Sequence, residues 1–197
     1  IAINEFIPTN NCINANAHGL ARFAALSQEA GLVPIIEPEV LMNGSHTIER
    51  CFEVTEQTLR EVFYQLAQHN VDLEGCLLKP NMVLSGASNT KRAFAEEVAE
   101  KTIACFKRVV PAAVPGIVFL SGGQSDDEAT LNLNAINKRG AKIDAPWELS
   151  FSYGRGLQQA TLKQWSGKSE NVTAAQTAFY RRAKLTSAAR QGRYTPE

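Results

Sequence analysis

The residue with the clearest chemical potential is Lys79, which ends a short apolar run in Gly75-Cys76-Leu77-Leu78-Lys79-Pro80. Such a run predicts a buried strand that stops at Pro80, because proline has no N–H to donate to a neighbouring strand. Burial generally lowers the pKa of an amine and so prepares a lysine to attack a carbonyl carbon. The alternative is a lysine whose ammonium group reaches solvent at the end of a strand.

Three further apolar runs resemble the one before Lys79, and longer helical patterns separate them. Near-continuous apolar runs are typical of parallel strands that are covered on both faces. The runs span residues 32–37, 76–79, 117–120 and 147–152, and the helical patterns span residues 11–30, 47–68, 91–107, 155–165 and 169–190, with one more opening at a capping box, Ser125–Glu128. This alternation predicts an α/β fold with a parallel sheet or a (β/α)8 TIM barrel.

Polar or glycine-rich groups follow all four predicted strands. In a β/α barrel the working side chains stand at the carboxyl ends of the strands, so we expect these groups to share one active site. They are Glu37 and Glu39 after the first strand, Lys79 after the second, Ser121, Gly122 and Gly123 after the third, and Ser152, Gly154 and Arg155 after the fourth. Taken singly, they would be solvated carboxylates, a tight turn and a surface cation.

Together these groups predict a reaction on a phosphorylated carbonyl compound. Free backbone N–H groups at residues 121–123, leading to the helix that begins at Ser125, form an anion pocket, and Arg155 pairs with the same phosphate. Lys79 attacks a ketone to give an iminium, which accepts electrons during carbon–carbon cleavage. Glu37 takes up and returns protons.

Composition excludes several other classes of protein. The 197 residues fit one domain, residues 1–197, and 20 basic residues balance 20 acidic ones, so nothing points to nucleic acid or an anionic membrane. No membrane-spanning stretch and no signal-peptide pattern are evident. The four cysteines lack CxxC spacing and are expected to be reduced thiols, and the three scattered histidines predict no metal site.

Over longer segments the sequence resembles a known family. The segment Val71-Asp72-Leu73-Glu74-Gly75-Cys76-Leu77-Leu78-Lys79-Pro80-Asn81 closely resembles the active-site signature of class I fructose-bisphosphate aldolases. Further similar segments are Gly31–Leu41, Phe119–Ser125, Leu131–Asn137, Phe151–Arg155 and Gln191–Pro196. The resemblance covers essentially the whole chain, in order.

The resemblance implies roles for each matching residue. Lys79 would be the Schiff-base nucleophile and Glu37 the acid/base residue, with Glu39 in the same polar network. The residues expected at a substrate phosphate are Ser121, Gly122, Gly123, Ser152, Gly154 and Arg155. The family is a group of carbon–carbon lyases that cleave fructose 1,6-bisphosphate to dihydroxyacetone phosphate and glyceraldehyde 3-phosphate in glycolysis and reverse the reaction in gluconeogenesis. Its members need no metal or cofactor and are usually cytoplasmic homotetramers, with plastid forms in plants.

The resemblance is confined to the rear part of the family's chain. Ile1–Glu5 looks like the end of the fourth barrel strand, so the chain is expected to supply strands 5–8 and their helices. Residues 1–197 alone would then leave open sheet edges and an apolar inner face at Val33, Ile35, Leu78 and Phe119, and would aggregate or stay loose. Two alternatives remain open: another Schiff-base lyase acting on a phosphorylated sugar, or a non-catalytic aldolase-like scaffold.

Overall fold

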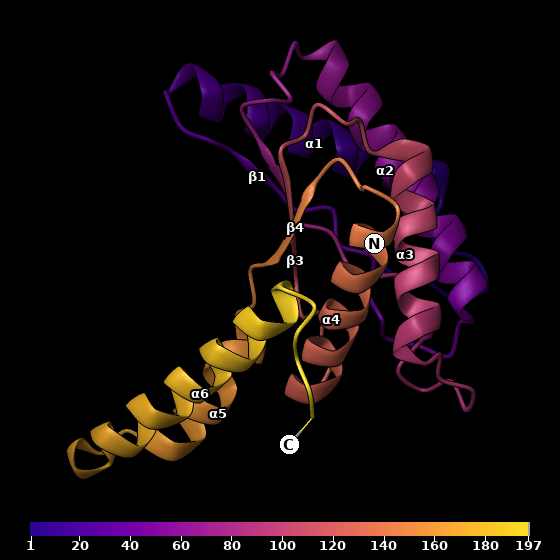
Figure 1. Cartoon of the computed structure of the whole chain (residues 1–197). Helices are drawn as coiled ribbons and strands as arrows, with labels where there is room; N and C mark the ends of the chain where they lie inside the picture. The colour runs from indigo at the N-terminus through magenta and orange to yellow at the C-terminus, as the bar shows by residue number, and fades with distance from the viewer. Residues whose placement is uncertain (197) are drawn as a thin grey trace.

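The structure is a computed structural model that describes residues 1–196. Helices and strands alternate along the chain, as the sequence predicts (Figure 1). The elements are α1 (Asn10–Glu29), β1 (Ile35–Ile36), α2 (Ile48–Gln68), β2 (Leu77–Leu78), α3 (Ala95–Val109), β3 (Gly116–Phe119), α4 (Asp126–Lys142), β4 (Glu148–Phe151), α5 (Arg155–Trp165), a 3₁₀ turn η1 (Ser169–Asn171) and α6 (Val172–Arg190).

The four strands form one parallel sheet in the order β1-β2-β3-β4. Ile36 lies opposite Leu78, Leu78 opposite Ile117, and Ile117 opposite Leu149. The Lys79 amide continues the first ladder by donating to the Ile36 carbonyl at 2.7 Å. Strands β1, β2 and β4 are shorter than their apolar runs, and β3 has the length of its run displaced by one residue.

The two faces of the sheet differ in burial. Helices α1 to α4 cover one face (Figure 1), where Leu78, Ile117 and Phe119 are at most 1% exposed. On the other face, within the described residues, Val33 is 66% and Ile35 43% exposed. The prediction that Leu78 and Phe119 line the open face was therefore wrong, because successive side chains of a strand point to opposite faces.

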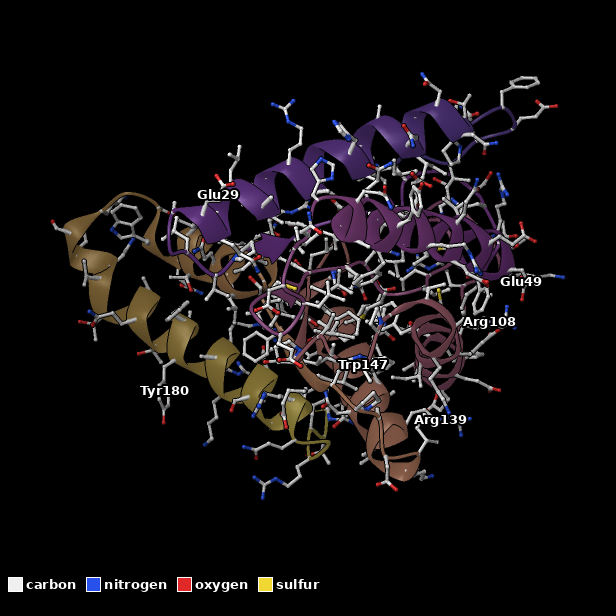
Figure 2. All side chains as sticks on the ribbon, turned by 90° about the horizontal axis from the view of Figure 1, so that it is seen from above. Glu29, Glu49, Arg108, Arg139, Trp147 and Tyr180 are labelled. Carbon is white, nitrogen blue, oxygen red and sulfur yellow. The ribbon has the colours of Figure 1, made fainter. Side chains whose placement is uncertain are left out.

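Aromatic side chains fill the layer between the sheet and its helices. Phe106 of α3 stacks on Phe119 of β3 with ring centroids 5.8 Å apart, and meets Trp147 edge-on at 6.5 Å. Figure 2 shows Trp147 inside the body of the protein, whereas Tyr180 points outward from α6. Because this layer anchors β3 and β4, the loops that leave these strands start from fixed positions.

Three helices, α1, α2 and α4, begin at a side-chain cap, and the cap of α4 is the capping box that the sequence predicts. The Oγ1 atoms of Thr9 and Thr47 accept from backbone amides three residues ahead, and Ser125 Oγ accepts from Glu128 N at 3.1 Å. Helix α3 has no such cap and begins at Ala95 rather than near Lys91, where the apolar pattern predicted its start. Residues 91–93 are bound outside the helix: Arg92 pairs with Glu128 of α4, and the Ala93 amide donates to Ser85 Oγ at 3.1 Å, contacts that local periodicity does not show.

Helices α5 and α6 form a hairpin that extends away from the rest of the molecule (Figure 1). After α6 the chain returns to α4, where the Tyr194 amide donates to Asn134 Oδ1 at 3.0 Å. Among residues 1–196, none of the helices combines the length and apolar character that crossing a membrane requires.

Candidate active site

The nucleophile candidate is paired with the acid/base candidate. Lys79 Nζ lies 3.0 Å from Glu37 Oε1. The strand register produces this pair: Ile36 and Leu78 are opposite each other, so the residues that follow them project side by side on the open face. The Lys79 side chain is 20% exposed and the Glu37 side chain 45%. The sequence predicted apolar burial around the lysine, and the structure adds a carboxylate that can exchange protons with it.

The Asn81 side chain links the loops next to the Lys79–Glu37 pair, and sequence reasoning did not single it out. Its Oδ1 accepts from the Val40 amide at 2.9 Å, and its Nδ2 donates to Thr55 Oγ1 at 3.1 Å. The side chain therefore joins the loops after β1 and β2 to helix α2, directly beside Glu37 and Lys79. The available signal was a single amide side chain in an otherwise apolar run, because a buried amide must be hydrogen-bonded.

The loops after β1 and β2 are also joined by main-chain hydrogen bonds. Gly86 N donates to His46 O at 2.8 Å, Ala87 N to Met42 O at 2.7 Å, and Ser88 N to Gly44 O at 2.9 Å. Gly86 permits this close approach, since a Cβ atom at that position would lie 2.4 Å from the Gly44 carbonyl oxygen. These bonds fix the loops that surround the Lys79–Glu37 pair.

A glycine turn that is a candidate anion site follows β3. Gly122 and Gly123 have φ values of +57° and +86°, and within residues 1–196 their amides donate to no protein acceptor. Successive free amides in such a turn form a concave site for an anion. Arg155 Nη2 lies 3.8 Å from the position of a Cβ on Gly123, and among the described residues no carboxylate pairs with this guanidinium.

The helix that supports the anion site best is α5 rather than α4. The first turn of α4 carries Asp126, Asp127 and Glu128, whose charges oppose a phosphate there. Helix α5 begins after Gly154, has no acidic residue in its first turn and has no side-chain cap. The Arg155 and Gly156 amides at its start have no acceptor in the described residues, and Gly156 lies against Ser121, so this helix start is the better candidate to support an anion. This refines the prediction that the helix beginning at Ser125 completes the pocket.

The remaining predicted residues lie around these two clusters. Glu39 Oε1 is 3.8 Å from the position of a Cβ on Gly122, and in the described part of the chain no hydrogen bond or ion pair joins it to Lys79. Ser121 is buried, with its Cβ 3.2 Å from the position of a Cβ on Gly156. The Ser152 amide continues the β3–β4 ladder by donating to Phe119 O at 2.8 Å.

Histidine and cysteine side chains lie outside this site. The rings of His18 and His69 meet with centroids 5.0 Å apart between α1 and α2, a proximity that the sequence did not predict. Across residues 1–196, no group of three or more histidine, cysteine or acidic side chains gathers in a way that could hold a metal ion. The cysteines are free thiols, and burial raises the pKa of Cys76 to about 11 and that of Cys105 to about 12.

Comparison with known proteins places this geometry in a family. The profile described as "Fructose-bisphosphate aldolase class-I" matches residues 1–197. A probable fructose-bisphosphate aldolase class 1 of Xanthomonas axonopodis pv. citri is 54% identical over 98% of this chain, and the cytosolic fructose-bisphosphate aldolase 6 of Arabidopsis thaliana is 55% identical over 98%. The chain belongs to the class I fructose-bisphosphate aldolase family.

A solved structure supports the same assignment. A fructose-bisphosphate aldolase from Plasmodium falciparum, in complex with TRAP and a small-molecule inhibitor, matches all of this chain with a TM-score of 0.95 and 46% identity. The match covers 56% of that protein's chain, and this chain covers 58% and 53% of the two relatives above. The chain thus spans about half the length of its relatives, and the parallel α/β fold confirms the prediction of the second half of an aldolase barrel.

Proposed function

We propose that the protein containing this chain is a class I fructose-1,6-bisphosphate aldolase that cleaves its substrate reversibly to dihydroxyacetone phosphate and glyceraldehyde 3-phosphate. The observation that carries the proposal is the 3.0 Å Lys79–Glu37 pair, at the same sheet edge as the free Gly122–Gly123 amides and Arg155. A lysine with a proton acceptor, placed beside an anion site, suits Schiff-base chemistry on a sugar phosphate.

The Lys79–Glu37 pair can perform each proton transfer of that chemistry. Glu37 accepts a proton from the Lys79 ammonium, and the free amine then forms a C–N bond with the ketone carbon of the substrate. Glu37 returns its proton to the carbinolamine hydroxyl, which leaves as water, and an iminium remains. The Glu37 carboxylate then takes the proton of the hydroxyl on the departing carbon, the electron pair of the cleaved carbon–carbon bond moves into the iminium to give an enamine, and the other fragment leaves as an aldehyde. Return of this proton to the enamine carbon, followed by addition of water to the iminium, releases dihydroxyacetone phosphate and the Lys79 amine.

The phosphate side supplies binding and orientation. The Gly122 and Gly123 amides, the first turn of α5 and the Arg155 guanidinium would bind one phosphate group through charge-assisted hydrogen bonds. Ser121, Ser152 and Gly154 border the same loops and would complete that site. Glu39, whose carboxylate lies near Gly122, would belong to the polar network between the phosphate and the reacting carbon.

Covalent trapping tests the proposal on the full-length protein. Incubation with dihydroxyacetone phosphate and borohydride should leave a stable adduct on the peptide that contains Lys79. The Lys79→Arg variant should lose both the adduct and turnover, because a guanidinium stays protonated and cannot attack a carbonyl. An adduct on a different lysine, or activity that EDTA abolishes, would contradict the assignment.

We further propose a cytoplasmic homotetramer. Cytosolic isozymes of Arabidopsis thaliana and a cytoplasmic isozyme of Pisum sativum are among the relatives, and a chloroplastic Arabidopsis relative at 53% identity makes a plastid form the alternative. Light scattering of the full-length protein tests the assembly, and a monomer at working concentration would contradict it.

A further inference from the structure

Arg182 is a buried arginine that lies on α6, outside all four strand ends. Its side chain is 7% exposed, and its guanidinium lies 3.6 Å from an Asp126 oxygen and 3.9 Å from an Asp127 oxygen. A guanidinium is costly to bury unless it is paired and hydrogen-bonded. The α5–α6 hairpin is otherwise largely exposed. The contacts of the Arg182 guanidinium show what its burial achieves.

The contacts of Arg182 link two helix starts. Nε donates to the Gly156 carbonyl at 3.1 Å, and Nη2 donates to the Asp126 carbonyl at 2.9 Å and to Thr130 Oγ1 at 2.8 Å. Gly156 belongs to the first turn of α5, and Asp126 to the first turn of α4. One guanidinium therefore spans the two turns that directly follow the anion-binding loops after β3 and β4.

Apolar packing does not hold the starts of α4 and α5 together in place of the Arg182 hydrogen bonds. A cavity of about 660 Å³ lies between α4, α5 and α6, with Arg182, Leu131 and Leu185 among its lining residues. On the other side of the turn, a Cβ on Gly156 would lie 3.2 Å from Ser121 Cβ, so a shift of α5 changes the anion loop directly. The hydrogen bonds of Arg182 thus hold α5 in place at the point where it touches that loop.

We propose that Arg182 is a positioning residue for the phosphate site: its guanidinium fixes the start of α5, and with it Arg155, relative to the Gly122–Gly123 turn. This inference rests on the proposed function, since it assigns a support to the phosphate site of that reaction. A lysine can replace Arg182 only in part, because a single ammonium lacks the planar fork that reaches both carbonyls at once.

The test compares Arg182→Met and Arg182→Lys with Arg190→Met in the full-length protein. Arg190 is a matched control on the same helix, exposed and paired with Glu148 at 3.0 Å. The measurements are the inhibition constant of inorganic phosphate, KM and kcat for fructose 1,6-bisphosphate, and borohydride trapping of Lys79 by unphosphorylated dihydroxyacetone.

Loss of Arg182 should displace Arg155 and weaken phosphate binding more than it changes the chemistry at Lys79. Arg182→Met should raise the phosphate inhibition constant and KM by about 10- to 100-fold. It should change kcat and dihydroxyacetone trapping by less than about twofold. Arg182→Lys should show a smaller rise in the same two constants, and Arg190→Met none. Unchanged phosphate affinity in Arg182→Met, or an equal loss of phosphate binding and dihydroxyacetone trapping, would overturn the inference.

Two further measurements distinguish a positioning role of Arg182 from a folding defect and from a failure of the proposed reaction. If Arg182→Met does not fold, Thr130→Val removes one acceptor of the guanidinium and should still raise the phosphate inhibition constant, and an unchanged constant would overturn the inference. A wild-type protein without aldolase turnover would contradict the proposed function alone. The phosphate affinity of that protein, measured by direct binding, would still support or overturn the role of Arg182.

Discussion

The two sides of the candidate active site are held in place by different kinds of bond. Around Lys79 and Glu37, most links between the loops after β1 and β2 are main-chain hydrogen bonds, such as Gly86 N to His46 O, and the Asn81 side chain adds a bond to the Val40 amide. Around the phosphate loops, side chains from elsewhere make the links: Arg182 binds the starts of α4 and α5, and the Tyr153 hydroxyl donates to the Ala129 carbonyl at 2.9 Å.

This difference has a functional meaning. A nucleophile must be held within a fraction of an ångström of its productive position, and main-chain bonds between loops leave little freedom to shift. A phosphate is a large, charged and symmetric group that tolerates small displacements of its ligands. Substitutions of side chains should therefore change binding on the phosphate side, while on the nucleophile side they should change chemistry or local stability.

The largest effect in this comparison is expected from Glu37→Gln. The amide keeps the size of the carboxylate next to Lys79 but cannot accept a proton, so the proton-transfer steps should slow by roughly 10²–10⁴-fold while some Schiff base still forms. Single-turnover kinetics with borohydride trapping measures both quantities. Glu170→Gln is the control, because Glu170 is an exposed carboxylate on η1, outside the site, and an equal loss in both variants would contradict the role of Glu37.

Arg155→Ala should weaken binding with little change in chemistry. Loss of a charge-assisted hydrogen bond of about 1.5–3 kcal/mol lowers affinity for the bisphosphate by about 10- to 150-fold. Calorimetric titration with the bisphosphate and with an unphosphorylated ketose separates phosphate recognition from general binding. Equal losses for both ligands would show that Arg155 has a structural role instead.

Gly86→Ala probes the main-chain bonds on the nucleophile side. The new methyl group would meet the Gly44 carbonyl oxygen at 2.4 Å, so the loops must separate, at a cost of about 1–3 kcal/mol in the free energy of unfolding. Denaturant unfolding measures this loss, and trapping at Lys79 should fall with it. The matched control is Gly19→Ala on α1, where nothing lies within 4 Å of the added methyl group and no loss is expected. Equal stability of the two variants would show that the loops adjust freely.

The smallest expected effect is a pH dependence of stability that arises at His46, in the loop after β1. Burial, followed by the charges of Arg50 and Arg92, lowers the pKa of His46 from its ordinary value of 6.5. Neither ring nitrogen has a hydrogen-bond partner within residues 1–196. The unfolded chain therefore binds a proton more readily than the folded protein, so stability is lost as the pH falls below 6.5. The fall in Tm between about pH 7.5 and about pH 5.5 should be smaller in His46→Gln than in the wild type, and equal falls would contradict this.

The positions of the strands, and of the polar residues at their carboxyl ends, could be predicted from the sequence because apolar runs and the residues that end them are local properties. Apolar runs located β1 to β4, and the polar residues that follow them identified Lys79, Glu37 and Arg155. Parallel strands bring their carboxyl ends to one edge, so no long-range information was needed. The prediction for Leu78 and Phe119 was wrong because it took apolar character as evidence of the inner face without following the alternation.

The supports of the site could not be predicted in the same way. Arg182 binds main-chain carbonyls, and any residue type at Gly156 or Asp126 would offer the same acceptor. The sequence around Arg182 contains other basic residues that are exposed, so residue type did not distinguish it. The later start of α3 likewise depends on the Arg92–Glu128 pair, whose members are 36 residues apart.

The pairing of Ile36 with Leu78 makes the chemistry depend on strand register. Lys79 faces Glu37 only because the residues before them are opposite each other. A shift of one residue between β1 and β2 would turn Lys79 toward the helices and separate it from the carboxylate. A molecule folded in that alternative register would have much the same secondary structure and would be chemically silent. The fraction of molecules that borohydride can label therefore measures correct strand pairing, and serves as a covalent assay of refolding quality that circular dichroism cannot replace.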